Sequence, residues 1–206
     1  MNRRLTTRGK ERRRQLLEFS AKRFAENGYH PTSVAEIVQG LGVGKGVFYW
    51  YFDSKEQLFL EILREAQQDL RRTQQQAIGD EPDPIHRIVL GMHASMQWSA
   101  DHPDYYKLTQ FALTEERFVP ALRKGQEVAI RDVMRHVTAG IESGEVRETD
   151  PLYIAHAILG ITTQLSRVFL HEQNKPPNEV ADEAVRFVLD GILLTSRDGA
   201  RTPTGA

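Results

Sequence analysis

Apolar residues recur at helical spacing along almost the whole of this 206-residue chain, and only clusters of glycine and proline interrupt the pattern. No segment shows the alternation of apolar and polar residues that is typical of a strand of useful length. The chain contains no cysteine, so disulfide bridges, thiolate metal sites and cysteine nucleophiles are excluded. We therefore expect an all-α protein whose core is built by the packing of helices.

Capping residues, glycines and prolines mark where we expect the helices to begin and end. Ser33, with Glu36 three residues later, predicts a capping box at a helix start, and Gly28 is typical of the end of the preceding helix. The expected helices span about residues 8–27, 33–41, 45–51, 54–77, 84–100, 105–113, 117–142, 151–172 and 178–195. Because no uninterrupted apolar run reaches about 18 residues, we expect no membrane helix. The basic N-terminus has no apolar segment behind it, so we expect no secretory signal and a cytoplasmic location.

Charge is distributed unevenly along the chain. Residues 1–55 carry eleven basic and five acidic groups, a net charge of +6, whereas the remaining residues carry sixteen basic and 23 acidic groups, a net charge of −7. A basic module on an acidic body is typical of a protein that faces a polyanion. The alternative is a solvated face that happens to be basic. The arm from Arg3 to Arg14 is expected to be disordered alone and to follow DNA when DNA is present.

Two short helices joined by a turn occupy residues 33–51. Gly42-Val43-Gly44 forms the expected turn, so the segment reads as a helix-turn-helix, whose second helix enters the major groove. Phe48 and Phe52 are four residues apart and are expected to face the core. The residues then left outward are Lys45, Gly46, Val47, Tyr49 and Trp50, and the lysine, tyrosine and tryptophan donors among them suit DNA.

The segment LGVGKGVFYWYFDSKEQL at residues 41–58, with the amphipathic helix before it, closely resembles the TetR (tetracycline-repressor-like) family of transcriptional regulators. The resemblance covers about residues 8–60, with Gly42, Tyr49, Phe52, Lys55 and Leu58 in register. It implies a three-helix DNA-binding head and a C-terminal bundle of about six helices. It also implies DNA contacts by Ser33, Lys45, Gly46, Val47, Tyr49, Trp50 and Lys55.

Within that set, Tyr49 and Lys55 look like the family's phosphate-contacting tyrosine and lysine. A cation is unfavourable at a helix start, so a phosphate beside Lys55 would remove a penalty. Gly44 and Val47 depart from the family pattern, which usually has serine or threonine at these positions. This departure leaves the preferred DNA sequence open but does not change the expectation that the protein binds DNA. The alternatives are that Tyr49 is a packed aromatic residue and that Trp50 lies at a subunit contact.

The C-terminal body predicts two further partners. The last two helices carry wide apolar faces, which suit either a monomer core or a dimer seam, and the resemblance favours a homodimer through these helices. TetR-like proteins usually bind a small molecule among the middle helices. The candidate lining residues are Met92, His93, Met96, Gln97, Trp98, Tyr105, Phe111, Gln164 and Phe169. Each is individually more typical of core, but His93, Gln97 and Gln164 would need polar partners if buried.

The sequence therefore predicts a ligand-responsive homodimeric regulator, with repression as the expected mode, that binds a palindromic operator in double-stranded DNA and is released by a small-molecule effector. The expected domains are a helix-turn-helix head with a basic arm (1–54), a ligand-binding and dimerisation body (55–197) and a disordered tail (198–206). The alternatives are a transcriptional activator, and a helical small-molecule-binding protein with a non-functional head. We find no catalytic constellation, no cofactor motif and no metal-ligand spacing among the seven histidines, and we expect no membrane partner.

Overall fold

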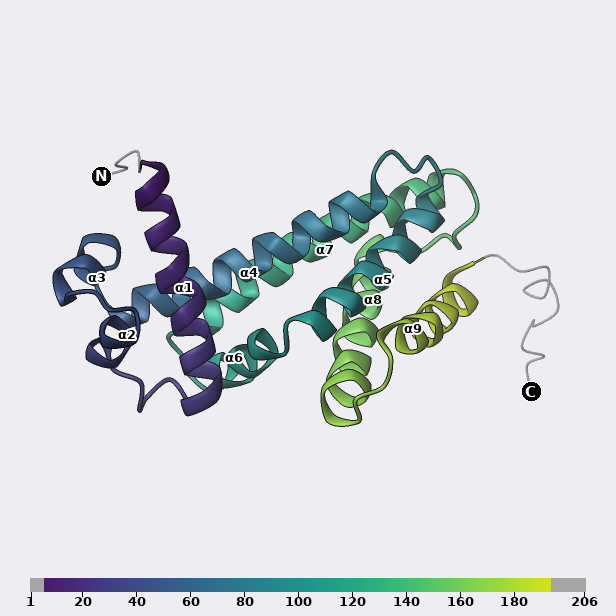
Figure 1. Cartoon of the computed structure of the whole chain (residues 1–206). Coiled ribbons are helices and arrows are strands. Elements are labelled where there is room, and N and C mark those ends of the chain that lie inside the picture. Colours follow the sequence, from purple (N-terminus) through teal and green to yellow (C-terminus); the bar gives the residue numbers. More distant parts are fainter. Residues whose placement is uncertain (1–5, 194–206) are drawn as a thin grey trace. The chain divides into compact units, whose positions relative to one another are not determined.

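The computed structural model describes residues 6–193, so Arg3, Arg4 and the predicted tail at 198–206 lie outside the described residues. Within this range the fold is all-α, as predicted, and the only extended pairing is one isolated bridge between Val146 and Leu193. The elements are α1 (Thr7–Asn27), α2 (Val34–Gly40), α3 (Lys45–Tyr51), α4 (Lys55–Ile78), α5 (Pro84–Asp101), α6 (Pro103–Leu113), α7 (Val119–Glu142), α8 (Pro151–Leu165), η1 (Ser166–Glu172) and α9 (Pro177–Ile192) (Figure 1).

Local chemistry explains where the first helices begin and end. Thr6 caps α1 by accepting a hydrogen bond from the Gly9 amide, and the chain leaves α1 through Gly28, whose φ of 89° favours glycine. Ser33 caps α2 by accepting from the Glu36 amide at 3.1 Å, as predicted. The capping box is incomplete, however, because the Glu36 carboxylate binds Arg23 of α1.

The packing divides the chain into two compact units, which are described separately here. The first comprises the described part of Met1–Asp69 together with His102–Gly125. In it α1 packs against α2 and α6, and α2 packs against α3. Its core contains Leu16, Leu17, Phe24, Ile37, Phe48, Phe52, Leu58, Phe59, Leu63 and Phe118.

The second unit comprises Leu70–Asp101 and the described part of Gln126–Ala206. Helix α5 packs against α9, α8 packs against α9, and η1 packs against both α5 and α8. Its core contains Ile85, Ile88, Met92, Met96, Val137, Ile154, Ile158, Val180, Ala184 and Val188. No helix in the described range is both long enough and apolar enough to span a bilayer.

Three sequence expectations differ from the structure. The boundary predicted at residue 54 is not the boundary between the compact units, because Leu58 and Phe59 of α4 are buried in the same core as α1–α3. The arm is helical from Thr7 onward, because Thr6 caps it. A single α-helix is predicted for residues 151–172. The α-helix ends at Leu165 and is followed by a π-helix, in which hydrogen bonds join residues five apart, such as that from the Gln173 amide to the Val168 carbonyl at 3.1 Å.

Candidate nucleic-acid interface

The turn between α2 and α3 is set by glycine and by backbone hydrogen bonds. Gly42 has a φ of 64°, in the left-handed region that favours glycine. The Val43 amide donates to the Val38 carbonyl at 2.9 Å, which closes the turn onto α2. The chain then enters α3 at Gly44, which has no side chain and therefore provides no side-chain cap. This geometry gives the compact helix-turn-helix visible at the N-terminal end of the chain (Figure 1).

Helix α3 is amphipathic in the predicted sense. Phe48 and Phe52 are fully buried, whereas the side chains of Tyr49 and Trp50 are 54% and 51% exposed. Two large aromatic residues with polar hydrogen-bond donors therefore lie on the outer face of a helix that is anchored by two phenylalanines. This arrangement is unfavourable for an isolated protein in water and suits a surface that contacts another molecule.

The N-terminal part of α3 is open. Lys45 and Gly46 are exposed, and Val47 is half-buried. A Cβ added at Gly44 or Gly46 would meet no heavy atom within 4 Å. The backbone at this end of α3 is therefore accessible to a large partner, as the absence of side chains at these two positions suggested.

Ser33 and Lys55, at the starts of α2 and α4, differ in what their side chains contact. The Ser33 side chain is exposed, and its oxygen caps α2. The Lys55 ammonium donates to the backbone carbonyls of Tyr29 and Thr32, both at 2.9 Å. A lysine predicted to contact phosphate is thus occupied by the protein's own backbone, and a phosphate contact by Lys55 stays a prediction that these bonds oppose.

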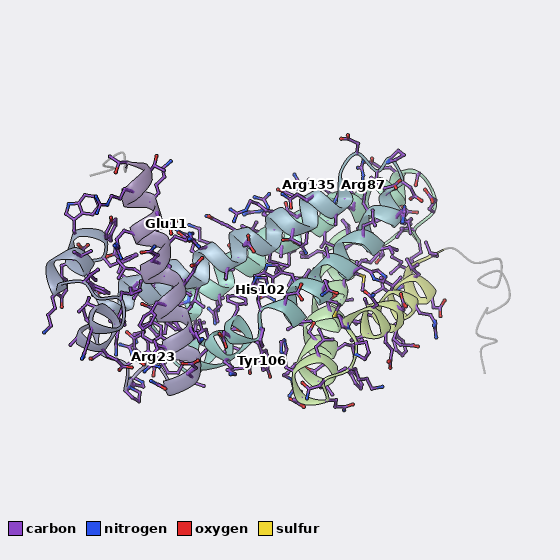
Figure 2. The ribbon with its side chains drawn as sticks, viewed as in Figure 1. Glu11, Arg23, Arg87, His102, Tyr106 and Arg135 are labelled. Atoms are coloured by element: carbon purple, nitrogen blue, oxygen red, sulfur yellow. The ribbon has the colours of Figure 1, made fainter. Side chains whose placement is uncertain are left out.

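Ion pairs occupy part of the basic charge in the N-terminal quarter. Arg13 of α1 binds Glu61 of α4 at 2.6 Å and also contacts Glu65. Arg23, labelled near the end of α1 in Figure 2, binds Glu36 of α2 at 2.7 Å, which lowers the pKa of that carboxyl. These side chains hold helices together. Glu61 and Glu65 lie beyond residue 55, so the net charge of +6 counted for residues 1–55 overstates the charge that DNA would meet, whereas the pair of Arg23 with Glu36 is already balanced within that count.

The comparisons with known proteins address the same segment. A family model described as "Bacterial regulatory proteins, tetR family" matches residues 16–62, from α1 to the first half of α4. Over residues 16–62 the chain is similar to this family. The HTH-type transcriptional repressor KstR2 of Mycobacterium tuberculosis is 28% identical over 189 residues, covering 88% of this chain and 92% of the relative. The transcriptional activator FasR of Mycolicibacterium smegmatis is 26% identical over 187 residues, covering 88% and 83%.

A solved TetR-family structure extends the likeness to the whole fold. The regulator PfmR from Thermus thermophilus superposes with a TM-score of 0.71 at 25% identity, covering 85% of this chain and 97% of that structure. The six helices α4–α9 after the head match the architecture predicted for the described chain. These relatives and this solved structure are transcriptional regulators rather than enzymes, and the chain is similar to them over most of its length.

The candidate effector-binding residues are divided between the two compact units. Met92, Met96 and Trp98 are buried in the second unit. Tyr105 and Phe111 belong to the first unit, where Phe111 stacks on Tyr29 with ring centroids 5.2 Å apart. The α6 segment that carries them packs against α1, which spacing along the sequence does not reveal.

The polar members of the predicted set are mostly on the surface of the second unit. Gln97 and Gln164 are exposed, Gln97 donating to Asp101 and Gln164 accepting from Arg167. His93 is half-buried and lies 3.3 Å from Asp182. Phe169 is also half-buried and packs on the second core. These four residues therefore have neighbours that explain them without an effector.

Sequence reasoning missed the polar groups that do lie inside the second unit. His171 Nε2 is 2.9 Å from Ser99 Oγ, and burial lowers the pKa of this histidine. Ser166 Oγ donates to Met96 Sδ at 2.9 Å, and the buried Thr162 hydroxyl has no hydrogen-bond partner. The available signal was the spacing of Thr162 and Ser166, which fall four residues apart on the apolar face of a predicted helix. Among residues 6–193, no group of three potential ligands is arranged for a metal ion.

Proposed function

We propose that this protein acts as a homodimeric repressor that binds a roughly palindromic operator through α3 of each subunit and is released by a small-molecule effector. The observation that carries the proposal is the exposure of Tyr49 and Trp50 on a helix anchored by buried Phe48 and Phe52. The relative KstR2 is a transcriptional repressor. The activator FasR keeps activation as the second candidate.

In this proposal each outward residue of α3 has a role that its chemistry allows. The Tyr49 hydroxyl and the Trp50 indole N–H donate to phosphate oxygens, which sets the register of the head on the duplex. Lys45 pairs with phosphate or with the guanine edge, and Val47 meets a thymine methyl. Gly46 lets the backbone of α3 approach the groove without an intervening side chain.

The proposed dimer uses α8 and α9. The apolar side chains of these helices are of two kinds: Ile154 and Ile158 are buried in the subunit's own core, whereas Tyr153 and Phe187 are 74% and 66% exposed. Large exposed apolar side chains on neighbouring helices favour an intersubunit contact. A two-fold dimer would present two copies of α3 to half-sites about one DNA turn, roughly 34 Å, apart.

The proposed effector site lies in the second unit. Support comes from polar groups beside the apolar core of this unit, namely the half-buried pair of Ser99 with His171 and the buried Thr162 hydroxyl, which has no hydrogen-bond partner. Ligand sites combine apolar walls with a few polar groups. An effector that binds more tightly to a conformation that cannot bind the operator lowers DNA affinity. The size of this effect is set by the difference between the effector's binding free energies for the two conformations.

The test is a selection of bound fragments from random DNA with the purified protein, followed by affinity measurements on the enriched sequence. We expect a palindrome, and we expect Tyr49→Phe, which removes one hydroxyl, to weaken binding about tenfold or more. Tyr106→Phe removes the same hydroxyl from a half-buried tyrosine of α6, outside both α3 and the proposed dimer contact, and is the matched control, with affinity expected to be unchanged. Failure to enrich any sequence would contradict the proposal and favour a small-molecule-binding protein with a non-functional head.

A further inference from the structure

The connection between α1 and α2 is short and tightly held. It runs from Gly28 to Ser33, where α2 is capped. Thr32 is fully buried, and its hydroxyl donates to the Gly28 carbonyl at 2.9 Å. Tyr29 is buried in an aromatic cluster, with its ring 5.0 Å from that of Phe59. This segment, residues 28–33, fixes where α2 begins and therefore where α3 lies relative to α1.

The Lys55 side chain binds this segment from the first residue of α4. Its ammonium donates to the carbonyls of Tyr29 and Thr32 at 2.9 Å and lies 3.4 Å from the carbonyl of His30. An ammonium has three N–H donors, so three carbonyls use its full capacity. The same nitrogen lies 4.3 Å from the centroid of the Tyr29 ring, a cation–π distance.

These contacts explain a lysine at a helix start, where the helix dipole disfavours a cation. The partial negative charges of the carbonyls and the face of the Tyr29 ring offset the dipole. Burial, together with the positive charge of Arg117, lowers the pKa of Lys55. A phosphate group would have to displace backbone acceptors that already surround the ammonium, at the cost of leaving the part-buried carbonyls of Tyr29 and Thr32 without this donor.

A second set of contacts holds the same segment. His30 Nε2 lies 2.8 Å from Glu115 Oε1, and Arg117 binds Glu115 at 2.9 Å. The Arg117 guanidinium also lies 5.3 Å from the Tyr29 ring centroid. The segment is thus bound by α4 and by the connection between α6 and α7, which makes its position a property of the whole first unit.

We infer that Lys55 is a positioning residue that ties the carbonyls of residues 29–32 to the start of α4, and so fixes Ser33 and the helix-turn-helix for DNA, without itself contacting phosphate. The inference rests on the proposed function, because it assigns how the head is held for operator binding. It reverses the role that resemblance to the TetR family gives this lysine.

Two measurements on Lys55→Met test this role. The first is operator affinity as a function of salt concentration, because each phosphate contact contributes about 0.9 to the slope of log K against log salt. The second is amide hydrogen exchange of the segment 28–33 in the free protein. Lys175→Met is the matched control, since Lys175 also lies over an aromatic ring, Phe169, but in the second unit.

We expect Lys55→Met to weaken operator binding about tenfold, the loss typical of a hydrogen bond to a charged group, with the salt slope unchanged. We also expect faster exchange in residues 28–33, and no change in either readout for Lys175→Met. A slope shallower by about 0.9 for each subunit, with unchanged exchange, would show a phosphate contact and overturn the inference. Faster exchange with unchanged affinity would show a purely structural role and would also overturn it. If the parent protein binds no DNA, the proposed function fails, and the exchange comparison still decides whether Lys55 holds the segment.

Discussion

Substituting Gly46 should change protein stability and operator affinity in opposite directions. Gly46 is the second residue of α3, it is exposed, and a Cβ there would meet no heavy atom within 4 Å in the free protein. Alanine in a helix is favoured over glycine by roughly 0.5–1 kcal/mol. Because Gly46 lies near the helix start, we expect Gly46→Ala to raise the free energy of unfolding by about 0.5 kcal/mol, or the melting temperature by about 1–2 °C.

The same methyl group should weaken operator binding if α3 lies against DNA. Forcing an extra methylene into a close-packed contact costs about 1–3 kcal/mol, which corresponds to roughly a 5- to 150-fold loss of affinity. Gly46→Leu serves as an internal control, because leucine and alanine have similar helix propensity but differ in volume. Stability should then be nearly equal in the two variants, while affinity falls in the order glycine, alanine, leucine.

The assay combines thermal unfolding followed by circular dichroism with fluorescence anisotropy on a labelled operator. Protein concentration is held constant in both, since a dimer makes apparent stability depend on concentration. Unchanged operator affinity in both Gly46→Ala and Gly46→Leu would refute the reasoning, because the open end of α3 would then not face the duplex.

Three further predictions follow from the packing. Gly40→Ala should destabilise the protein by about 1–3 kcal/mol in urea unfolding, because its Cβ would overlap the ring of Phe19; an unchanged midpoint would contradict this. Phe59 is fully buried against four aromatic rings, so Phe59→Ala should cost about 3–5 kcal/mol and Phe59→Leu clearly less; equal losses would show that the ring contacts do not matter. Burial lowers the pKa of His136 and of His171, so the unfolded chain binds more protons below about pH 6.5 and the free energy of unfolding should fall as pH drops from about 7 to 5. In His171→Asn the free energy of unfolding should fall less over this pH range, and a fall as large as in the parent protein would show that His171 does not contribute to it.

Features that depend on near neighbours in the chain could be predicted from the sequence. The spacing of Phe48 and Phe52 places both on one face of a short helix, and the structure buries both. The Glu36 amide at the start of α2 needs a hydrogen-bond acceptor, and the Ser33 hydroxyl oxygen provides it. The exposure of Tyr49 and Trp50 follows from the same helical geometry.

Features that depend on distant segments could not be predicted in the same way. Local reasoning showed that a cation at residue 55 needs negative partners, but the carbonyls of Tyr29 and Thr32 come to it only through the packing of α1 and α4 in one core. The Glu36 carboxylate likewise binds Arg23, thirteen residues earlier, instead of completing its own cap. Helical spacing marked Phe111 as apolar but did not reveal that it stacks on Tyr29.

The central claim, that the outer face of α3 contacts the operator, can be measured with the protein's own two tryptophans. Trp50 is 51% exposed on α3, whereas Trp98 is 5% exposed in the second unit, so Trp50 should provide nearly all of the fluorescence that acrylamide can quench. The measurement is acrylamide quenching with and without saturating operator DNA, and Trp50→Phe identifies the accessible class. The account predicts that operator DNA protects Trp50 from the quencher. Saturating binding that leaves the quenching of Trp50 unchanged would contradict it.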